Sequence, residues 1–314
     1  MDPTSYAIHR RFPQGSHTET WLLEGQTAPK RKAVLERLRQ AIDNIERRGP
    51  TLGPSALAPS TLARAKDAKP VWQFGCPQAD RRLLANGLET NAIHEIKPVP
   101  LGSGTAAGDW TAGIGFSLRL AVRRMHALEA DPRSHKPWAL WCWPKVLASE
   151  LGRPTAAGLI RLGLDPNRLI FVETARASDT LLALEEALKS KSLSLVFGVL
   201  DDIALTPTRR LSLAAAAGKT PCLLVTHAAS PPAGATATRW RIERAISGRH
   251  AFDPRAPGNP RFVIDLERCR SHHAHAGLPP LTVEWSDETH RFAVAAELAD
   301  HTFAAHGARL RSPP

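Results

Sequence analysis

The feature that most constrains the fold is a series of short apolar segments separated by helix-length segments. The clearest of them, Pro137–Trp143, is almost uninterrupted, as is typical of a strand buried on both faces of a sheet. Further strands are predicted at 92–96, 169–173, 193–199 and 221–226, and helices at 110–128, 146–162 with a break at 152–154, 178–190 and 207–217. Such alternation forms right-handed βαβ units, so we predict an α/β fold with a mostly parallel twisted sheet flanked by helices.

Individual residues suggest where two of these helices begin and end. Ser178 is expected to cap the helix over 178–190. Pro207 is expected to begin the helix over 207–217, and Gly218 to end it.

After residue 237 the apolar residues recur at every second position. Trp240, Ile242 and Ile246 alternate with polar residues, and the segments 261–270, 281–285 and 292–294 repeat this period. A period of two with one polar face is typical of antiparallel strands. We therefore predict C-terminal antiparallel strands that close one edge of the sheet.

The N-terminal segments form a separate region before the core. Residues 1–29 show no periodicity and are expected to be a disordered or loosely ordered tail. Residues 30–48 are predicted to form a separate amphipathic helix, which either packs on the chain's own core or docks on a neighbouring protein. The proline-rich residues 49–70 are expected to be a linker, 71–296 the core, and 297–314 a C-terminal tail.

Charge and composition narrow the classes of function. With 41 Lys and Arg against 30 Asp and Glu, the net charge is +11, which favours acidic partners such as nucleic acid. The excess is spread along the chain, so a basic solvated surface explains it equally well. No run of about 18 apolar residues is present, so no membrane span is predicted. The four cysteines are far apart and include no CxxC pair, which favours a reducing, cytoplasmic location.

Several segments carry a resemblance to known proteins. The strand Ile93-His-Glu-Ile96 runs into a glycine-rich loop and a helix, and the parallel units and late antiparallel strands follow, an order that resembles the RecA recombinase core. A closer resemblance rests on the segments 73–80, 92–96, 138–142, 184–188, 208–214, 237–242, 260–270 and 283–285. As an ordered set over residues 30–295 they resemble the ImuA family, RecA-like accessory proteins of the bacterial inducible mutagenesis cassette.

The resemblance implies a RecA-like core and a role in the DNA damage (SOS) response, as an adaptor in translesion DNA synthesis. The implied partners are the polymerase-like protein ImuB, the error-prone DNA polymerase of the cassette and RecA. The residues expected to contact partners are Val34, Leu35, Leu38, Ile42 and Ile45 on the apolar stripe, and Arg309, Leu310 and Arg311 in the tail. Two alternatives are a DNA-dependent ATPase that aids recombination and a cell-division inhibitor similar to SulA.

The glycine-rich loop lacks the groups that hold a nucleotide triphosphate. A working phosphate loop reads GxxxxGK[ST], in which the Lys neutralises phosphates and the hydroxyl ligates magnesium. The vestigial loop here comprises Gly102, Ser103, Gly104, Thr105, Gly108 and Asp109, and no Lys follows a glycine. Lys97 is poorly placed as a substitute, and the strand 137–143 ends without a carboxylate. We therefore expect no catalytic residues and no cofactor, although Asp201 or Asp202 with an unusual Lys could still hold a nucleotide.

Direct DNA contact is expected to be limited. The segment 228–236 has no Lys, Arg or aromatic residue, whereas single-strand binding combines cations with stacking rings. The candidate DNA contacts are Arg209 and Arg210, or the arginines between Arg239 and Arg270, with Arg239 and Arg241 as the first candidates in that range. Asp201 and Asp202 are expected to cap a helix and face solvent rather than act as an acid/base pair. Cys269, His272, His273 and His275 match no standard metal spacing and are expected to lie in a solvated loop.

Overall fold

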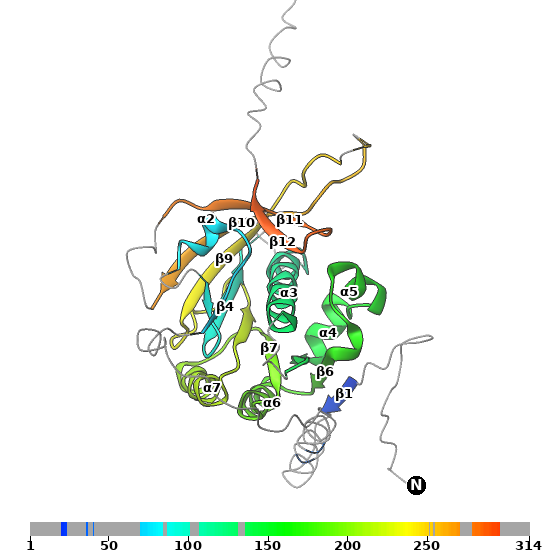
Figure 1. Ribbon diagram of the computed structural model, residues 1–314. Helices are drawn as coiled ribbons and strands as arrows, with labels where there is room; N and C mark the ends of the chain where they lie inside the picture. Colours follow the sequence, from blue (N-terminus) through cyan, green and yellow to red (C-terminus); the bar gives the residue numbers. More distant parts are fainter. Residues whose placement is uncertain are drawn as a thin grey trace, which may run out of the picture.

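The computed structural model describes residues 20–23, 36, 40, 70–83, 87–100, 107–130, 136–250, 252–253, 255–270 and 278–295. Within these residues, ten strands form one large sheet in the order β1-β6-β5-β7-β8-β4-β9-β10-β11-β12 (Figure 1). Six neighbouring pairs, from β1 to β9, are parallel and the last three are antiparallel. The predicted α/β architecture with antiparallel C-terminal strands is confirmed.

The parallel strands are buried along nearly their whole length, as predicted for 137–143, although β4 includes the polar residues His94, Glu95 and Lys97. They are β4 (Ile93–Pro98), β5 (Trp138–Pro144), β6 (Leu169–Thr174), β7 (Leu193–Leu200) and β8 (Cys222–Thr226). Every residue of β4, β6, β7 and β8 is buried, because helices cover both faces of the sheet. A further strand, β1 (Thr20–Leu23), pairs with β6 at the sheet edge. It lies in a segment for which the sequence predicted no regular element.

The helices cover the two faces of the sheet and bury two apolar clusters. They are α3 (Ala107–Glu129), α4 (Lys145–Leu151), α5 (Ala156–Leu162), α6 (Ala177–Lys189) and α7 (Leu205–Gly218), with a 3-10 turn at Pro166–Arg168. One cluster lies beneath α3, α4 and α5 and includes Phe116 and Leu159; the other lies beneath α6 and α7 and includes Leu184 and Leu211 (Figure 1). No described helix combines the length and apolar character needed to cross a membrane.

Strand β9 (Thr238–Ala245) joins the parallel and antiparallel parts of the sheet. It runs parallel to β4 on one side and antiparallel to β10 (Arg261–Cys269) on the other. Strands β11 (Leu281–Ser286) and β12 (Arg291–Val294) continue the antiparallel part. Trp240 and Ile242 are buried as predicted, but Ile246 lies beyond the end of β9 and is 91% exposed. The prediction that Ile246 shares the apolar face is therefore wrong.

A small two-stranded sheet packs over the end of the core and was not predicted. It consists of β2 (Val71–Trp72) and β3 (Leu88–Glu89), with the one-turn helix α2 (Pro77–Asp80) between them. Trp72 and Phe74 are completely buried, and the Phe74 ring lies 5.3 Å from that of Trp240. These aromatic contacts attach the first residues of the core to the antiparallel strands.

Two helix boundaries differ from the predictions. The N-cap of α6 is Arg176, so Ser178 lies within the first turn and does not cap the helix. Helix α7 begins at Leu205, two residues before Pro207, because proline is tolerated anywhere in the first turn, where the backbone N–H has no intrahelical partner. Helix α7 ends at Gly218 as predicted, and Lys219 takes the left-handed conformation with φ of 51°.

Candidate functional site

The carboxyl ends of β4, β7 and β8 meet at one edge of the sheet, where α/β proteins commonly bind ligands. A cavity of about 350 Å³ lies at this edge. Its lining residues come from α3, α4, the β7–α7 connection and the residue after β8, and they are Trp110, Leu147, Glu150, Asp201, Asp202 and His227. The sequence prediction had located no carboxylate after β5, but Glu150 on the following helix supplies one.

This carboxyl-edge cavity is acidic. Among the described residues its lining includes three carboxylates, Glu150, Asp201 and Asp202, all of which are exposed, and no Lys or Arg. Like charges repel, so this lining disfavours the phosphates of a nucleotide triphosphate. Among the described residues there is also no group of three or more His, Cys, Asp or Glu side chains placed to hold a metal ion.

Asp201 and Asp202 face solvent, as predicted, but they do not cap α7. The N-cap of that helix is Ala204, whose side chain makes no cap hydrogen bond. The backbone carbonyl of Asp201 instead accepts a hydrogen bond of 3.1 Å from the His227 N–H, which ties the β7–α7 connection to the residue after β8. The ring of His227 lies 5.6 Å from that of Trp110 and completes this wall of the cavity.

Lys97 is the lysine nearest in sequence to the glycine-rich loop, and its side chain is engaged within the fold. It is 2% exposed, and its ammonium group donates to the His227 carbonyl at 2.9 Å and to the carbonyl and hydroxyl of Ser230 at 2.6 and 2.8 Å. Burial lowers the pKa of Lys97, while the nearby Glu95 opposes that change. The lysine thus holds the segment that follows β8, with its donors used on protein carbonyl and hydroxyl oxygens.

Arg239, one of the candidate DNA contacts, forms a buried ion pair. Its Nε lies 2.7 Å from a carboxylate oxygen of Glu95, and its Nη2 donates to the Ala233 carbonyl at 2.8 Å. The two side chains are 12% and 0% exposed. Glu95 also accepts from the Thr226 hydroxyl and the Ala233 N–H. The arginine therefore neutralises a charge inside the fold.

The other candidate DNA contacts lie on two elements. Arg241 follows on β9 and pairs with Glu267 of β10, with both side chains partly exposed. Arg209 and Arg210 are exposed on α7, and Arg210 pairs with Glu185 of α6. Both of these paired arginines thus have carboxylate partners within the chain.

Other predicted site residues lie at the margin of the described structure or outside it. Gly108 and Asp109 belong to the first turn of α3. Three sets of residues lie outside the described part of the chain: the loop residues Gly102, Ser103, Gly104 and Thr105, the partner contacts Val34, Leu35, Leu38, Ile42, Ile45, Arg309, Leu310 and Arg311, and the histidines at 272, 273 and 275. Cys269 does not lie in a solvated loop as predicted, because it is the last residue of β10 and is buried. Within segment 30–48, Glu36 and Gln40 are helical and exposed.

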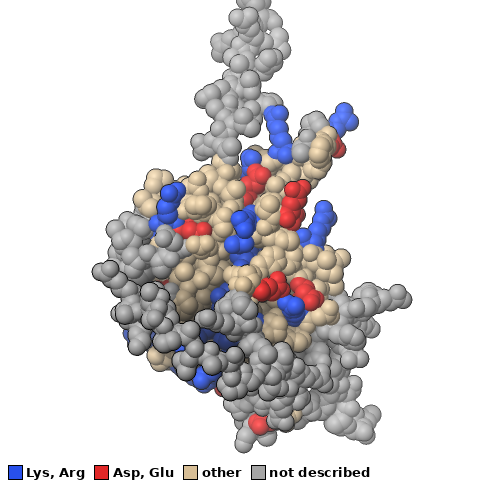
Figure 2. All heavy atoms as spheres, in the orientation of Figure 1, with Lys and Arg blue, Asp and Glu red and all other residues tan. Residues whose placement is uncertain are grey.

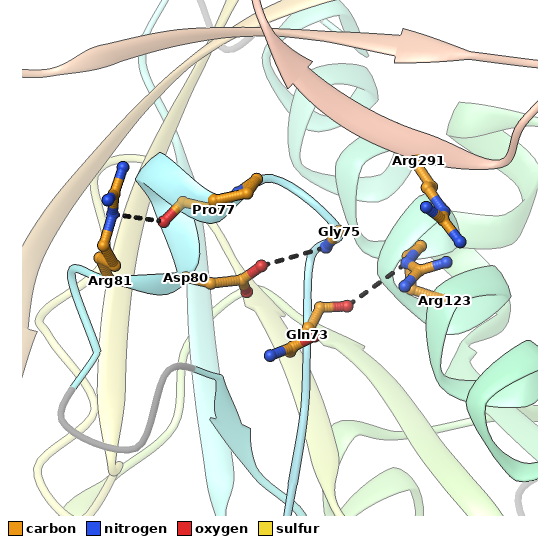
Figure 3. A pocket seen from close by; sticks show the side chains of 7 residues that line it. All are labelled: Gln73, Gly75, Pro77, Asp80, Arg81, Arg123 and Arg291. Atoms are coloured by element: carbon orange, nitrogen blue, oxygen red, sulfur yellow. Dashed lines mark hydrogen bonds between the residues drawn. The ribbon is translucent and has the colours of Figure 1, made fainter.

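A second cavity, of about 400 Å³, lies between α2, α3 and β12 and is rich in arginine (Figure 3). It is lined by Gln73, Gly75, Pro77, Asp80, Arg81, Arg123 and Arg291. Figure 3 shows Arg123 of α3 and Arg291 of β12 beside each other on one wall. Sequence reasoning missed this group because the fold assembles it from positions that are far apart along the chain.

This arginine cavity is lined by one carboxylate, Asp80, and three guanidinium groups, those of Arg81, Arg123 and Arg291. Asp80 accepts hydrogen bonds from the N–H groups of Phe74 and Gly75, and burial raises the pKa of its carboxyl above the ordinary value. Burial lowers the pKa of Arg123, and repulsion by Arg291 lowers it further. Two guanidinium groups that repel each other in a partly buried cavity provide a setting for a carboxylate or phosphate group.

Comparison with known proteins connects this architecture to one family. No family model matches the chain. Protein ImuA of Caulobacter vibrioides, strain NA1000 / CB15N, is 28% identical over 266 residues, which cover 79% of this chain and 98% of that protein. The similarity supports membership of the ImuA family. Protein ImuA from the strain ATCC 19089 / CIP 103742 / CB 15 matches with the same identity and coverage.

The ImuA alignment spans nearly all of the relative, so the similarity extends over the greater part of the fold rather than one motif. It agrees with the resemblance that the ordered segments between 73 and 285 indicated.

Proposed function

We propose that this chain is a non-catalytic adaptor of inducible mutagenesis, acting in translesion DNA synthesis. It joins the polymerase-like protein ImuB to the error-prone DNA polymerase of the cassette, and RecA is a third partner. The similarity to Protein ImuA supports the role in mutagenesis. The proposal that the chain does not hydrolyse nucleotides depends on the carboxyl-edge cavity.

The acidic lining of that cavity is the observation that carries the proposal. Phosphoryl transfer requires cations that stabilise charge on the transferred phosphate. The loop sequence has no Lys after its glycines, and Lys97 is bound to His227 and Ser230. With Glu150, Asp201 and Asp202 around the same edge, the described residues favour repulsion of a triphosphate.

A RecA-like core that does not cycle on a nucleotide can still present interaction surfaces. The apolar stripe of segment 30–48 and the end of the chain remain the proposed partner contacts. Helices with a continuous apolar face bind partners by laying that face into a groove. The net charge of +11 suits complexes assembled around DNA.

Calorimetric titration with ATP and magnesium tests the non-catalytic part of the proposal. We expect no saturable heat. Saturable binding at micromolar ATP would contradict the proposal and favour the DNA-dependent ATPase. In that case the Asp201→Asn, Asp202→Asn double variant shows whether these carboxylates take part in nucleotide binding. Its affinity for ATP with magnesium falls if they hold the magnesium ion.

Co-purification from cells with damaged DNA tests the partners. We expect the polymerase-like protein and the error-prone polymerase to be recovered with the wild-type chain, and to be absent with a Leu38→Glu, Ile42→Glu variant. Gln40→Glu is the matched control, since it adds a carboxylate at an exposed position of the same segment. Recovery of a tubulin-like division protein without polymerase subunits would support the division-inhibitor alternative and refute the adaptor.

A further inference from the structure

The connection between β9 and β10 projects from the sheet as a long arm, residues 246–260 (Figure 1). It carries the most exposed large apolar side chain among the described residues, Phe252, which is 93% exposed. Arg249, His250 and Arg255 flank this phenylalanine and are also exposed. Figure 2 shows basic side chains on the outer part of the projection, with an acidic side chain beside them. The arm therefore presents an aromatic ring among basic side chains, with one exposed carboxylate, Asp253, directly after it.

Backbone contacts hold the base of the arm in one geometry. The Gly248 N–H donates to the Asn259 carbonyl, and the Gly258 N–H donates to the Gly248 carbonyl, both at 3.0 Å. A β-bridge joins Arg249 to Pro257. A Cβ atom at Gly258 would lie 2.5 Å from the Gly248 carbonyl oxygen, so the two sides of the arm approach as closely as glycine allows.

The tip has its own hydrogen bonds. The Nδ1 atom of His250 accepts from the N–H groups of Phe252 and Asp253, at 3.3 and 3.1 Å. The Asp253 carboxylate accepts from the Arg255 N–H at 2.9 Å. The imidazole and phenyl rings of His250 and Phe252 lie 6.2 Å apart in an edge-on arrangement. These contacts constrain the backbone that carries the phenyl ring before any ligand binds, which reduces the entropy cost of binding.

Exposed aromatic rings between cations suit unpaired bases. Proteins bind single strands by stacking bases on aromatic rings while arginine and lysine follow the phosphates. The cores of protein interfaces instead need a contiguous apolar patch. On the described part of the arm the other large apolar side chain is Ile246, at its base, six positions from Phe252 along the chain. The arm thus resembles a stacking platform more than the core of a protein interface.

We propose that the 246–260 arm binds single-stranded nucleic acid, with Phe252 stacking on a base and Arg249 and Arg255 contacting neighbouring phosphates. This contact lies on a different part of the chain from the candidates on α7 and β9. It goes beyond the adaptor role and is independent of the glycine-rich loop. In the adaptor it would give the assembly a direct contact with single-stranded DNA.

Fluorescence anisotropy of the full chain with a labelled oligothymidylate tests the arm. Phe252→Ala should weaken binding by about 5- to 100-fold, as removal of one stacking ring does, and Phe252→Trp should restore it. The Arg249→Ala, Arg255→Ala pair should reduce the slope of log affinity against log salt by about 1.4, or about 0.7 for each phosphate that an arginine no longer neutralises. Leu213→Ala, at a position of α7 that is 72% exposed, is the matched control and should bind as wild type.

Three results would overturn the proposal. The first is that the wild-type chain does not bind the oligonucleotide. The second is that Phe252→Ala binds it as tightly as wild type. The third is that Leu213→Ala weakens binding as much as Phe252→Ala does. Since Phe252 is nearly fully exposed, its replacement should leave the melting temperature unchanged, so weaker binding cannot be attributed to unfolding. If Phe252→Ala no longer recovers the polymerase while oligonucleotide binding is unchanged, the arm is a protein contact. The adaptor role would then survive while the nucleic-acid proposal fails.

Discussion

Replacement of Arg239 by alanine should destabilise the protein far more than replacement of its neighbour Arg241. Arg239 neutralises Glu95, which is completely buried at the centre of the sheet. After the change, Glu95 keeps hydrogen bonds only from neutral donors among those described for it, the Thr226 hydroxyl at 3.2 Å and the Ala233 N–H at 2.9 Å, and the nearby Lys97 interacts with its charge without a hydrogen bond described between them. Removing one partner of a buried ion pair typically costs about 3–5 kcal/mol, because the remaining charge stays desolvated.

The size of this effect makes it measurable by urea unfolding. Domains are stable by about 5–15 kcal/mol, so Arg239→Ala should remove a large share of the free energy of unfolding. With a urea dependence of about 2–3 kcal/mol per molar, the midpoint should fall by about 1–2 M. Arg241→Ala is the matched control, because its pair with Glu267 is 36% and 24% exposed and should contribute about 0–1 kcal/mol.

A combined variant separates the charge from the packing. Replacing Glu95 by leucine and Arg239 by methionine removes both charges, and this should restore part of the stability that Arg239→Ala loses. If Arg239→Ala and Arg241→Ala unfold at midpoints that agree within error, the reasoning about the buried pair is refuted. Because Arg239 pairs with a buried carboxylate, Arg239→Ala should weaken DNA binding only under conditions in which it also unfolds the protein.

Three further changes test other parts of the fold. Asp80→Asn tests the pH dependence of stability. Because burial raises the folded-state pKa of Asp80 above 3.8, its carboxyl stabilises the fold most below that pH. The unfolding free energy of wild type relative to Asp80→Asn should therefore fall as pH rises, and a rise would contradict this. Gly218→Ala would place a Cβ atom 1.8 Å from the Leu188 carbonyl oxygen and should lower the free energy of unfolding in urea by about 3 kcal/mol. In Gly115→Ala, the control, the new Cβ atom meets nothing nearer than 3.4 Å, and the free energy of unfolding should rise by up to about 1 kcal/mol. Lys97→Met should cost about 1–3 kcal/mol, because the Ser230 carbonyl loses its lysine donor while the His227 carbonyl keeps the N–H and hydroxyl of Ser230. Equal amide exchange around Ser230 in both proteins would argue against this role.

The main elements of the fold were predictable because their signals are local. The apolar run over 137–143 and the period-two segments after 237 identified strands directly. The short β2–α2–β3 unit was missed because its burial depends on aromatic contacts made with distant elements, such as that of Phe74 with Trp240. The cap of α6 was misplaced because Ser178 has the right chemistry, yet the chain enters the helix two residues earlier.

The site residues were less predictable, because their roles depend on which side chains meet across the sheet. The sequence shows that the glycine-rich loop lacks its lysine, but not that Lys97 binds two carbonyls or that Glu150 reaches the same edge. Arg239 resembles a surface cation until its pairing with Glu95 is known. The exposure of Phe252 also needed the structure, since an isolated aromatic residue in a long connection has no local signature.

The position of β4 has a consequence for how the protein is made. This strand emerges early during synthesis, yet both of its neighbours, β8 and β9, come from much later in the chain. The Thr226–Glu95 hydrogen bond, for example, joins positions 131 residues apart. A nascent or truncated chain therefore holds a strand with two open edges whose residues are all buried in the folded protein, a state prone to aggregation and slow to fold. Expression of C-terminal truncations that end before residue 222 should yield insoluble protein, and chaperone dependence should end once β9 leaves the ribosome.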